Sequence, residues 1–252
     1  MKIKLGRYHL FALVLIVLTL SLVIFIEVRQ EALYPSNLGN YNQTGTFKIN
    51  PETIISSIDR GAVDIFTPVQ ATSEINISFL PPGSVLWTQS DYLKIAAALH
   101  EFVWKESIFD WGVYYLTFDR ECRDNLIGFD SAELTLFKPD GLKYLLRRIE
   151  INPLAGEVAW GAEASFPRPI LGKWNNIDLS QFSVNADQAL QIAEEHGGRE
   201  DRAKDKNGCK ILIRMPNTNN DERWDVSYYS SPNFEILIDP YTGEDQILES
   251  QQ

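Results

Sequence analysis

The chain has 252 residues, of which 44% are hydrophobic and 12% aromatic. This is enough apolar material to pack one large or two small domains, and it excludes a chain that is disordered throughout. The formal net charge of −11 gives a surface that repels nucleic acid and anionic lipid headgroups, so we expect no nucleic-acid partner.

The first predicted element is a membrane-spanning helix. Residues 10–26 are apolar apart from Thr19 and Ser21, and about 17 to 20 helical residues cross a bilayer. Basic residues precede this stretch, so the positive-inside rule places residues 1–7 in the cytoplasm and the remainder outside. We therefore predict a single-pass plasma-membrane protein with a signal-anchor helix over 8–28. A cleaved secretory signal is the alternative, but no small-x-small cleavage site follows the apolar stretch.

Residues 29–87 are predicted to be a linker and entry region. The linker part, up to residue 49, is polar and contains proline and glycine, which is typical of a flexible stalk. Asn50-Pro51 then begins a short helix, because asparagine caps helix N-termini and proline suits the first helical position. Short strands are predicted at 62–68 and 75–80.

Residues 88–161 are predicted to form a first helix-and-sheet unit. Thr88 or Ser90 caps a helix whose apolar residues recur at three- and four-residue spacing. The spacing then becomes typical of strands, in runs at 111–118, 132–137, 142–151 and 158–160. A hairpin turn is predicted at Pro139-Asp140-Gly141. The expected product is a helix followed by four antiparallel strands.

Residues 162–182 are predicted to connect this unit to a second one over 183–252, with Trp174 anchoring the connector. Asn185 or Ser183 caps a helix with a stripe of small apolar residues. Runs typical of strands follow at 209–215, 223–229, 234–239 and 245–248. The order of elements is the same as in the first unit.

A short phrase near the end of each unit supports the repeat. It reads Asn152-Pro153-Leu154-Ala155-Gly156-Glu157 in the first unit and Asp239-Pro240-Tyr241-Thr242-Gly243-Glu244 in the second. Proline with a fixed φ, followed by glycine, indicates a tight turn between antiparallel strands. We therefore predict an α+β fold made of two equivalent units, each a helix packed on a four-stranded antiparallel sheet, behind one transmembrane helix.

The second unit, over about residues 183–249, resembles the PepSY domain. The resemblance is carried by the Ala-rich helix at 185–193, the strand Trp224-Asp225-Val226-Ser227-Tyr228, and the turn from Asp239 to Glu244. The first unit looks like a divergent copy, which keeps the turn but has no Trp-x-Val strand. The resemblance implies an extracytoplasmic module that binds or inhibits a peptidase or another protein, and it implies no catalytic residues.

The sequence predicts no catalytic, cofactor-binding or metal-binding residue, and therefore no cofactor. His100 and His196 lack metal-site spacing, and no nucleophile-elbow motif is present. Cys122 and Cys209 lie in the predicted extracytoplasmic part, where an oxidising compartment permits a disulfide between them. Two inert thiols are the alternative.

Aromatic residues are concentrated in the predicted strands. Alternate side chains of a strand face opposite sides, so one set builds the core and the other set is available for a protein or peptide partner. The predicted partner surface consists of Trp111, Tyr115, Trp224, Tyr228 and Tyr229. Ordinary core and cross-strand packing is the alternative for these residues.

Three functional hypotheses follow. The first is a non-enzymatic, membrane-anchored extracytoplasmic protein that binds a protein or peptide, such as a peptidase, through its PepSY-like units. The second is an envelope hydrolase that uses a pair of acidic residues. The third is a structural part of an envelope complex.

Overall fold

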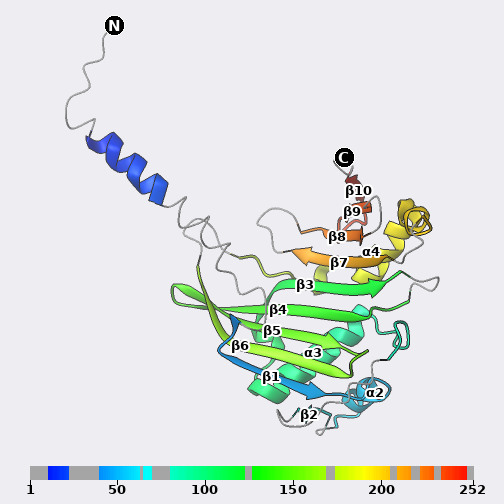
Figure 1. The fold of residues 1–252 in the computed structure, drawn as a ribbon. Coiled ribbons are helices and arrows are strands. Elements are labelled where there is room, and N and C mark those ends of the chain that lie inside the picture. The colour runs from blue at the N-terminus through cyan, green and yellow to red at the C-terminus, as the bar shows by residue number, and fades with distance from the viewer. Residues whose placement is uncertain are drawn as a thin grey trace.

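One antiparallel sheet organises the residues that the computed structural model describes, which are 11–22, 40–62, 65–69, 80–122, 127–168, 174–204, 209–216, 222–229 and 234–248. Its described strands lie in the order β10-β9-β8-β7-β3-β4-β5-β6-β1-β2 (Figure 1). They are β1 (Gln43–Lys48), β2 (Thr67–Pro68), β3 (Gly112–Glu121), β4 (Ser131–Asp140), β5 (Lys143–Asn152), β6 (Glu157–Pro167), β7 (Lys210–Pro216), β8 (Trp224–Tyr229), β9 (Phe234–Ile238) and β10 (Asp245–Leu248). The predicted combination of helices with antiparallel strands is confirmed.

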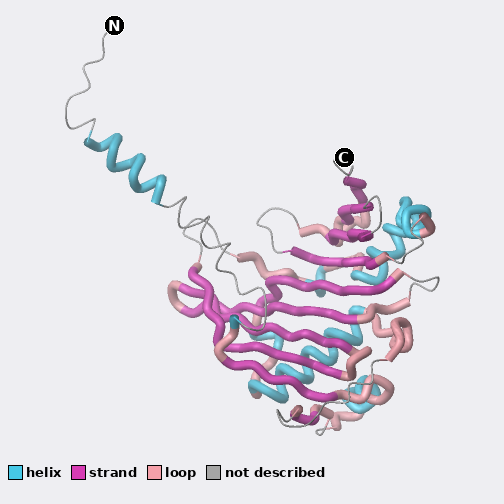
Figure 2. Tube along the Cα trace, viewed as in Figure 1, coloured by secondary structure: helices cyan, strands magenta, loops and turns pink. Residues whose placement is uncertain are grey.

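The helices are few and short compared with the sheet (Figure 2). Besides the helical residues 11–22, they are α2 (Ile54–Asp59), α3 (Gln89–Trp104), α4 (Ala186–Ala193) and α5 (Arg199–Arg202), with the short helical turns η2 (Ile108–Asp110), η3 (Leu179–Gln181) and η4 (Glu194–Gly198). In Figure 1, α3 crosses behind the strands of the β4–β6 region. Side chains of α3 and α4 belong to the same main core as the sheet residues beneath them.

Helices α3 and α4 begin where their local sequence predicts. Thr88 and Asp91 form a capping box at α3, and Asn185 and Gln188 form one at α4. In each box the side chain of the second residue accepts from the backbone N–H of the first, and at α4 the Asn185 side chain also accepts from the Gln188 N–H. The apolar stripes then face the sheet and are buried, at Tyr92, Ile95, Ala96 and Leu99 in α3 and at Ala186, Ala189, Leu190 and Ala193 in α4.

The strands form two groups of the same order on either side of one central pairing. After α3, the chain forms β3 to β6 in sequence; after α4, it forms β7 to β10. The first strands of the two groups, β3 and β7, pair antiparallel, from Tyr115 with Pro216 to Glu121 with Lys210. The sheet order therefore reads outward in the same way from this pair, as if a two-fold axis passed between β3 and β7.

The two Pro–Gly–Glu turns adopt matching conformations. Asn152 Oδ1 accepts from the Ala155 N–H at 3.0 Å, and Asp239 Oδ1 accepts from the Thr242 N–H at 2.9 Å. The glycines that follow have positive φ values, 61° at Gly156 and 78° at Gly243, a conformation that glycine adopts without steric cost. Each phrase thus links the last two strands of its group.

The linker expected up to residue 49 is shorter than predicted, because Gln43–Lys48 form β1. This strand pairs antiparallel with β6 over six residues. Its Phe47 side chain is 9% exposed and packs edge-on against Phe102 of α3 at 5.5 Å between ring centroids. One large apolar residue in a polar stretch was too weak a signal for a strand whose stability comes from its distant partner.

A second, smaller core lies on the sheet face opposite the helices. On β5, Tyr144 and Leu146 alternate with Leu145 and Ile149, and only the latter pair contacts the main core. Trp174 of the connector stacks on Tyr144 at 4.5 Å between ring centroids. The backbone N–H of Trp174 also donates to the Tyr144 hydroxyl at 3.1 Å. The expectation that Trp174 anchors the connector is confirmed.

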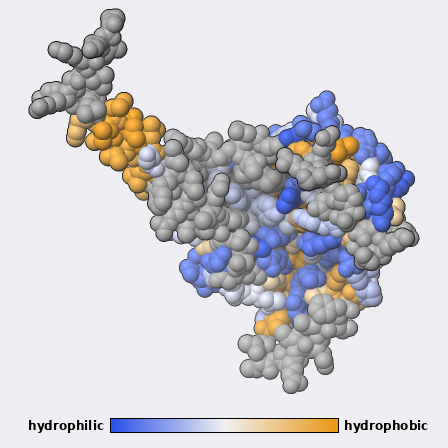
Figure 3. All heavy atoms as spheres, turned by 45° about the horizontal axis from the view of Figure 1, so that its top comes forward, coloured by the Kyte–Doolittle hydropathy of each residue, from blue (hydrophilic) through white to orange (hydrophobic). Residues whose placement is uncertain are grey.

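Parts of the remaining predictions lie outside the described residues. Residues 11–22 are helical, and their large hydrophobic side chains are exposed (Figure 3). Residues 8–10 and 23–28 of the predicted span are not among the described ones. Within the described part of the chain, no helix has the length and apolar character needed to cross a membrane. Most of the strand predicted at 75–80 also lies outside the described residues.

Candidate functional site

The predicted aromatic partner surface is wrong for three of its five residues. Trp224 and Tyr228 are 0% exposed and Trp111 is 7% exposed. Trp224 and Tyr228 share the face of β8 that α4 covers, because residues at even spacing on a strand point to the same side. Tyr115 is half-buried, and only Tyr229, on the opposite face of β8, is exposed.

Trp224 and Tyr228 hold the two ends of α4. The Trp224 Nε1–H donates to the Val184 carbonyl, just before the helix, at 2.8 Å. The Tyr228 hydroxyl donates to Glu194 Oε1, just after the helix, at 2.8 Å. Glu194 is itself buried and accepts from Arg202 Nε at 2.9 Å. These motif residues therefore position the helix on the sheet, and burial raises the pKa of the Tyr228 hydroxyl.

His100 is a buried structural residue. Its Nδ1 lies 3.0 Å from the Glu106 carbonyl oxygen, and Arg147 Nη1 donates to its Nε2 at 2.8 Å. Arg147 also lies over the Trp111 ring, 3.9 Å from its centroid. Nε2 accepts a bond, so the neutral ring carries its proton on Nδ1. Burial also lowers the His100 pKa. The cluster fixes the end of α3 on β5 and leaves no ring nitrogen for a substrate.

The two cysteines are joined in a disulfide, with their Cα atoms 5.2 Å apart. The Cys122 N–H also donates to the Cys209 carbonyl at 2.9 Å. The bond lies where β3 ends and β7 begins, so it links the two strand groups across their central pairing. The described residues contain no group of His, Cys, Asp or Glu that could hold a metal ion.

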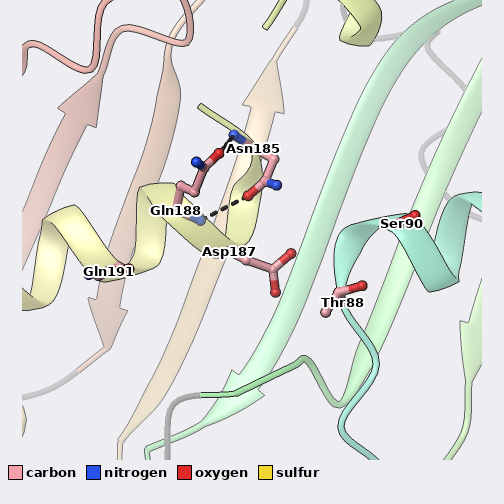
Figure 4. A pocket seen from close by; sticks show the side chains of 6 residues that line it. All are labelled: Thr88, Ser90, Asn185, Asp187, Gln188 and Gln191. Carbon is pink, nitrogen blue, oxygen red and sulfur yellow. Dashed lines mark hydrogen bonds between the residues drawn. The ribbon is translucent and has the colours of Figure 1, made fainter. Parts of the chain in front are cut away.

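The first helices of the two groups begin side by side, in a polar cleft of about 340 Å³. Figure 4 shows Asp187, in the first turn of α4, pointing toward the start of α3. Its carboxylate accepts from the Gln89 N–H at 2.9 Å. In return, the Gln89 side-chain oxygen accepts from the Ala186 N–H at 2.7 Å. Each helix therefore receives a cap from the other.

Asp187 already occupies the position that a bound anion would take at these helix N-termini. Its burial raises its pKa, but the hydrogen bond from Gln89 favours the charged form. The cleft is thus a joint between the two groups, in which Asp187 and Gln89 each bond to the start of the other's helix.

A larger, mostly apolar groove continues from this cleft along α3, and its volume is about 630 Å³. The cleft and the groove share Ser90 and Asn185. The apolar lining of the groove comes from α3, η2, the strands beneath and the connector, and comprises Leu93, Ala97, Ile108, Phe109, Trp111, Val113, Leu134, Ile177 and Leu179. A cavity of this size, with a mainly apolar lining and polar residues such as Ser90, Asn176 and Asp178 beside it, is typical of ligand and peptide sites.

The connector forms one wall of the groove and is held in place by β3. Asn176 Oδ1 accepts from the Val113 N–H at 2.8 Å, and the Ile177 N–H donates to the Val113 carbonyl at 3.1 Å. Asp178 turns the chain into η3 by accepting from the Ser180 N–H at 3.1 Å. The hydrogen bonds from Ser180 lower the Asp178 pKa, so this edge of the groove carries a negative charge.

The groove is also lined by an exposed aromatic side chain. Phe109 in η2 is 92% exposed, which is unusual for phenylalanine because exposing its ring to water is unfavourable. Nothing in the local sequence distinguished Phe109 or Leu93 from core residues. The groove forms where α3 contacts a connector more than 70 positions away in the sequence. Only the fold shows this contact.

The most strongly shifted carboxyl lies elsewhere, on the face opposite the helices. Burial raises the pKa of Glu133 to about 7, and the neighbouring Arg148 opposes this rise. Arg148 Nη2 donates to Glu133 at 2.7 Å, and its Nε donates to Glu150 at 2.8 Å. One guanidinium thus binds both carboxylates.

Comparison with known protein families identifies the C-terminal group. Residues 183–244 match the PepSY family, described as peptidase propeptide and YPEB domain. The resemblance predicted for this part of the chain is therefore confirmed. No curated protein and no solved structure matches the chain.

Proposed function

We propose that this chain, with its PepSY domain at residues 183–244, is a membrane-anchored extracytoplasmic binding or regulatory protein that acts on a peptidase or another envelope protein. The membrane anchor rests on the apolar stretch at residues 10–26. The β3–β6 group, with its preceding helix, is proposed to be a divergent PepSY copy. Its support is the shared order of elements and the matching Pro–Gly–Glu turn.

The observation that carries this proposal is the apolar groove beside α3. It lies at the junction of the two groups, and Phe109 extends its apolar surface into solvent. Exposed aromatic side chains at the edge of an apolar groove are typical anchors for protein partners. We propose that a partner segment lies along α3 and contacts Phe109.

A matched pair of variants tests the groove. Phe109 and Leu142 are both 92% exposed, but Leu142 lies at the β4–β5 hairpin, away from the lining of the groove. The purified full-length chain and the variants Phe109→Ser and Leu142→Ser are used to capture proteins from a cell-envelope extract. A protein that the wild type and Leu142→Ser retain, and that Phe109→Ser loses, supports the proposal. Equal retention by all three contradicts the groove, and no recovered partner under several conditions contradicts binding.

An acid-pair hydrolase is the second candidate, because Glu133 has a pKa near neutrality, the range that suits a general acid or base. The shared ion pair with Arg148 argues against it, because Arg148 engages both Glu133 and Glu150. Hydrolysis of model peptide or glycoside substrates by the wild type, lost in Glu133→Gln, would favour the enzyme.

A further inference from the structure

The outer edges of the two strand groups differ in whether another strand of the chain pairs with them. On one side, the edge of β6 is covered by β1, which pairs with it from Gln43 with Ala162 to Lys48 with Glu157. On the other side, β10 is the last of the described strands. By the matching turns, Glu157 corresponds to Glu244, Val158 to Asp245 and Trp160 to Ile247. The pairing of β1 with β6 therefore shows which kind of strand binds such an edge.

The backbone of β10 is arranged to accept another strand. The Asp239 N–H donates to the Glu244 carbonyl across β9–β10 at 2.8 Å. Backbone groups of an antiparallel strand point alternately to either side, so Gln246 bonds toward β9 while Asp245 and Ile247 direct their N–H and C=O groups outward. Edge strands are commonly protected by lysine, proline or a bulge. The other edge, β2, contains Pro68, whereas β10 contains neither residue.

The side chains along β10 indicate the chemistry of a strand that fits. At β6, Lys48 Nζ lies 2.6 Å from Glu157 Oε1, and Glu244 occupies the corresponding place on the second group. Glu244 is exposed, whereas the carboxylate of Asp245, which points to the other face of the strand, already lies 2.8 Å from His196 Nδ1. A cationic side chain opposite Glu244 is therefore favoured.

The position opposite Ile247 takes a larger side chain than its counterpart at β6. There, Gly45 pairs with Trp160, and a Cβ atom at Gly45 would lie 2.7 Å from the Trp160 ring nitrogen. Ile247 is smaller than tryptophan and is 50% exposed. A β-branched or other apolar residue opposite it would cover this exposed side chain.

We propose that the outer edge of β10 binds an extended, antiparallel peptide strand of a partner protein, with a basic residue opposite Glu244 and an apolar residue opposite Ile247. This mode of binding adds one strand to the sheet through main-chain hydrogen bonds. It extends the proposed binding function to a second surface, separate from the groove beside α3.

The probe is a fluorescent synthetic peptide with the sequence of residues 43–49 and the substitution Gly45→Val. The valine clashes with Trp160 at β6, so the peptide cannot replace β1 there. We expect fluorescence anisotropy to show saturable binding to the purified full-length chain. Glu244→Lys should weaken this binding about fivefold or more at low salt, since the cation then meets a like charge. Asp140→Lys, at an exposed acidic residue of the β4–β5 hairpin, should leave it unchanged.

Backbone methylation of the peptide tests the main-chain bonds. At β6, the Ile49 N–H donates to the Gly156 carbonyl, so the N–H of residue 47 also faces the sheet and that of residue 46 faces away. N-methylation at position 47 should weaken binding about tenfold or more, while methylation at position 46 should have little effect.

Three results of the peptide experiments would overturn the proposal. They are no measurable binding of the peptide, equal binding by Glu244→Lys and the wild type, and loss of binding in Phe109→Ser, which would place the peptide in the groove. Sedimentation that shows a dimer of the wild type and a monomer of Glu244→Lys would also overturn it, because a second copy would then occupy the edge. The groove proposal is unaffected by all of these results except the third.

Discussion

Asp187 and Gln89 cap each other's helices across the junction of the two strand groups. The Asp187 carboxylate accepts from the Gln89 backbone N–H at 2.9 Å, while the Gln89 side chain accepts from the Ala186 N–H at 2.7 Å. The two residues lie 98 positions apart. Their exchange links the PepSY domain to the preceding helix and places the groove beside this joint.

Loss of either cap should destabilise the fold. Asp187→Ala and Gln89→Ala are each expected to lower the free energy of unfolding by about 1 kcal/mol, because a first-turn N–H group then lacks its acceptor. Urea denaturation measures the change. Gln191→Ala is the control, since Gln191 lines the same cleft but its side chain bonds to the exposed Glu195 side chain of the same helical segment. An effect of Asp187→Ala no larger than that of the control would contradict the capping role.

Removal of the disulfide should lower the free energy of unfolding by more than the loss of any single helix cap. The bond closes a loop between residues 87 positions apart, and such cross-links stabilise proteins by about 2–4 kcal/mol, chiefly by restricting the unfolded chain. The double variant Cys122→Ser/Cys209→Ser should show this loss in urea. A reducing agent should produce the same loss in the wild type and none in the variant. An unchanged midpoint on reduction of the wild type would show that the bond contributes little.

Loss of the hydroxyl should change the stability of the protein very differently at two adjacent tyrosines. Tyr228→Phe removes a bond to the buried Glu194 carboxylate and is expected to cost about 1–3 kcal/mol. Tyr229→Phe, at a side chain that is 48% exposed, should change the stability by less than about 0.5 kcal/mol. Thermal unfolding of both variants provides the comparison, and similar losses in the two would contradict the assignment of Tyr228 to the end of α4.

Glu133 should make the stability fall as the pH rises. Its pKa is raised to about 7 in the folded protein from an ordinary value of 4.5. Between these two values the folded state binds more protons than the unfolded state, so the free energy of unfolding decreases with increasing pH. Glu133→Gln should therefore be nearly neutral at pH 5 and stabilising by about 1–2 kcal/mol at pH 8, a figure reduced for the partial exposure of the side chain.

The measurement is urea denaturation of the wild type and Glu133→Gln at both pH values. A variant that is destabilised equally at pH 5 and pH 8 would show that the ion pair with Arg148 outweighs the burial of Glu133.

Local signals predicted most of the elements and their order. The capping residues, the apolar stripes and the two Pro–Gly–Glu turns identified α3, α4 and the hairpins, because each depends on residues only a few positions apart. The same signals failed for β1, whose polar sequence is stabilised by its pairing with β6. They also failed for the partner surface. The alternation of side chains along a strand places Trp224 and Tyr228 on one face and Tyr229 on the other. It does not show which of the two faces α4 will cover.

By itself, the sequence determined the two helix-and-strand groups, the turns that end them and the PepSY character of the second group. All of these follow from side-chain size, backbone preference and hydrogen bonding over short distances along the chain. Only the tertiary structure decided that β3 and β7 join the groups into one sheet, that Gln89 and Asp187 exchange caps, and that α3 and the connector enclose a groove. These features depend on contacts between segments far apart in sequence, whose pairing no local pattern specifies.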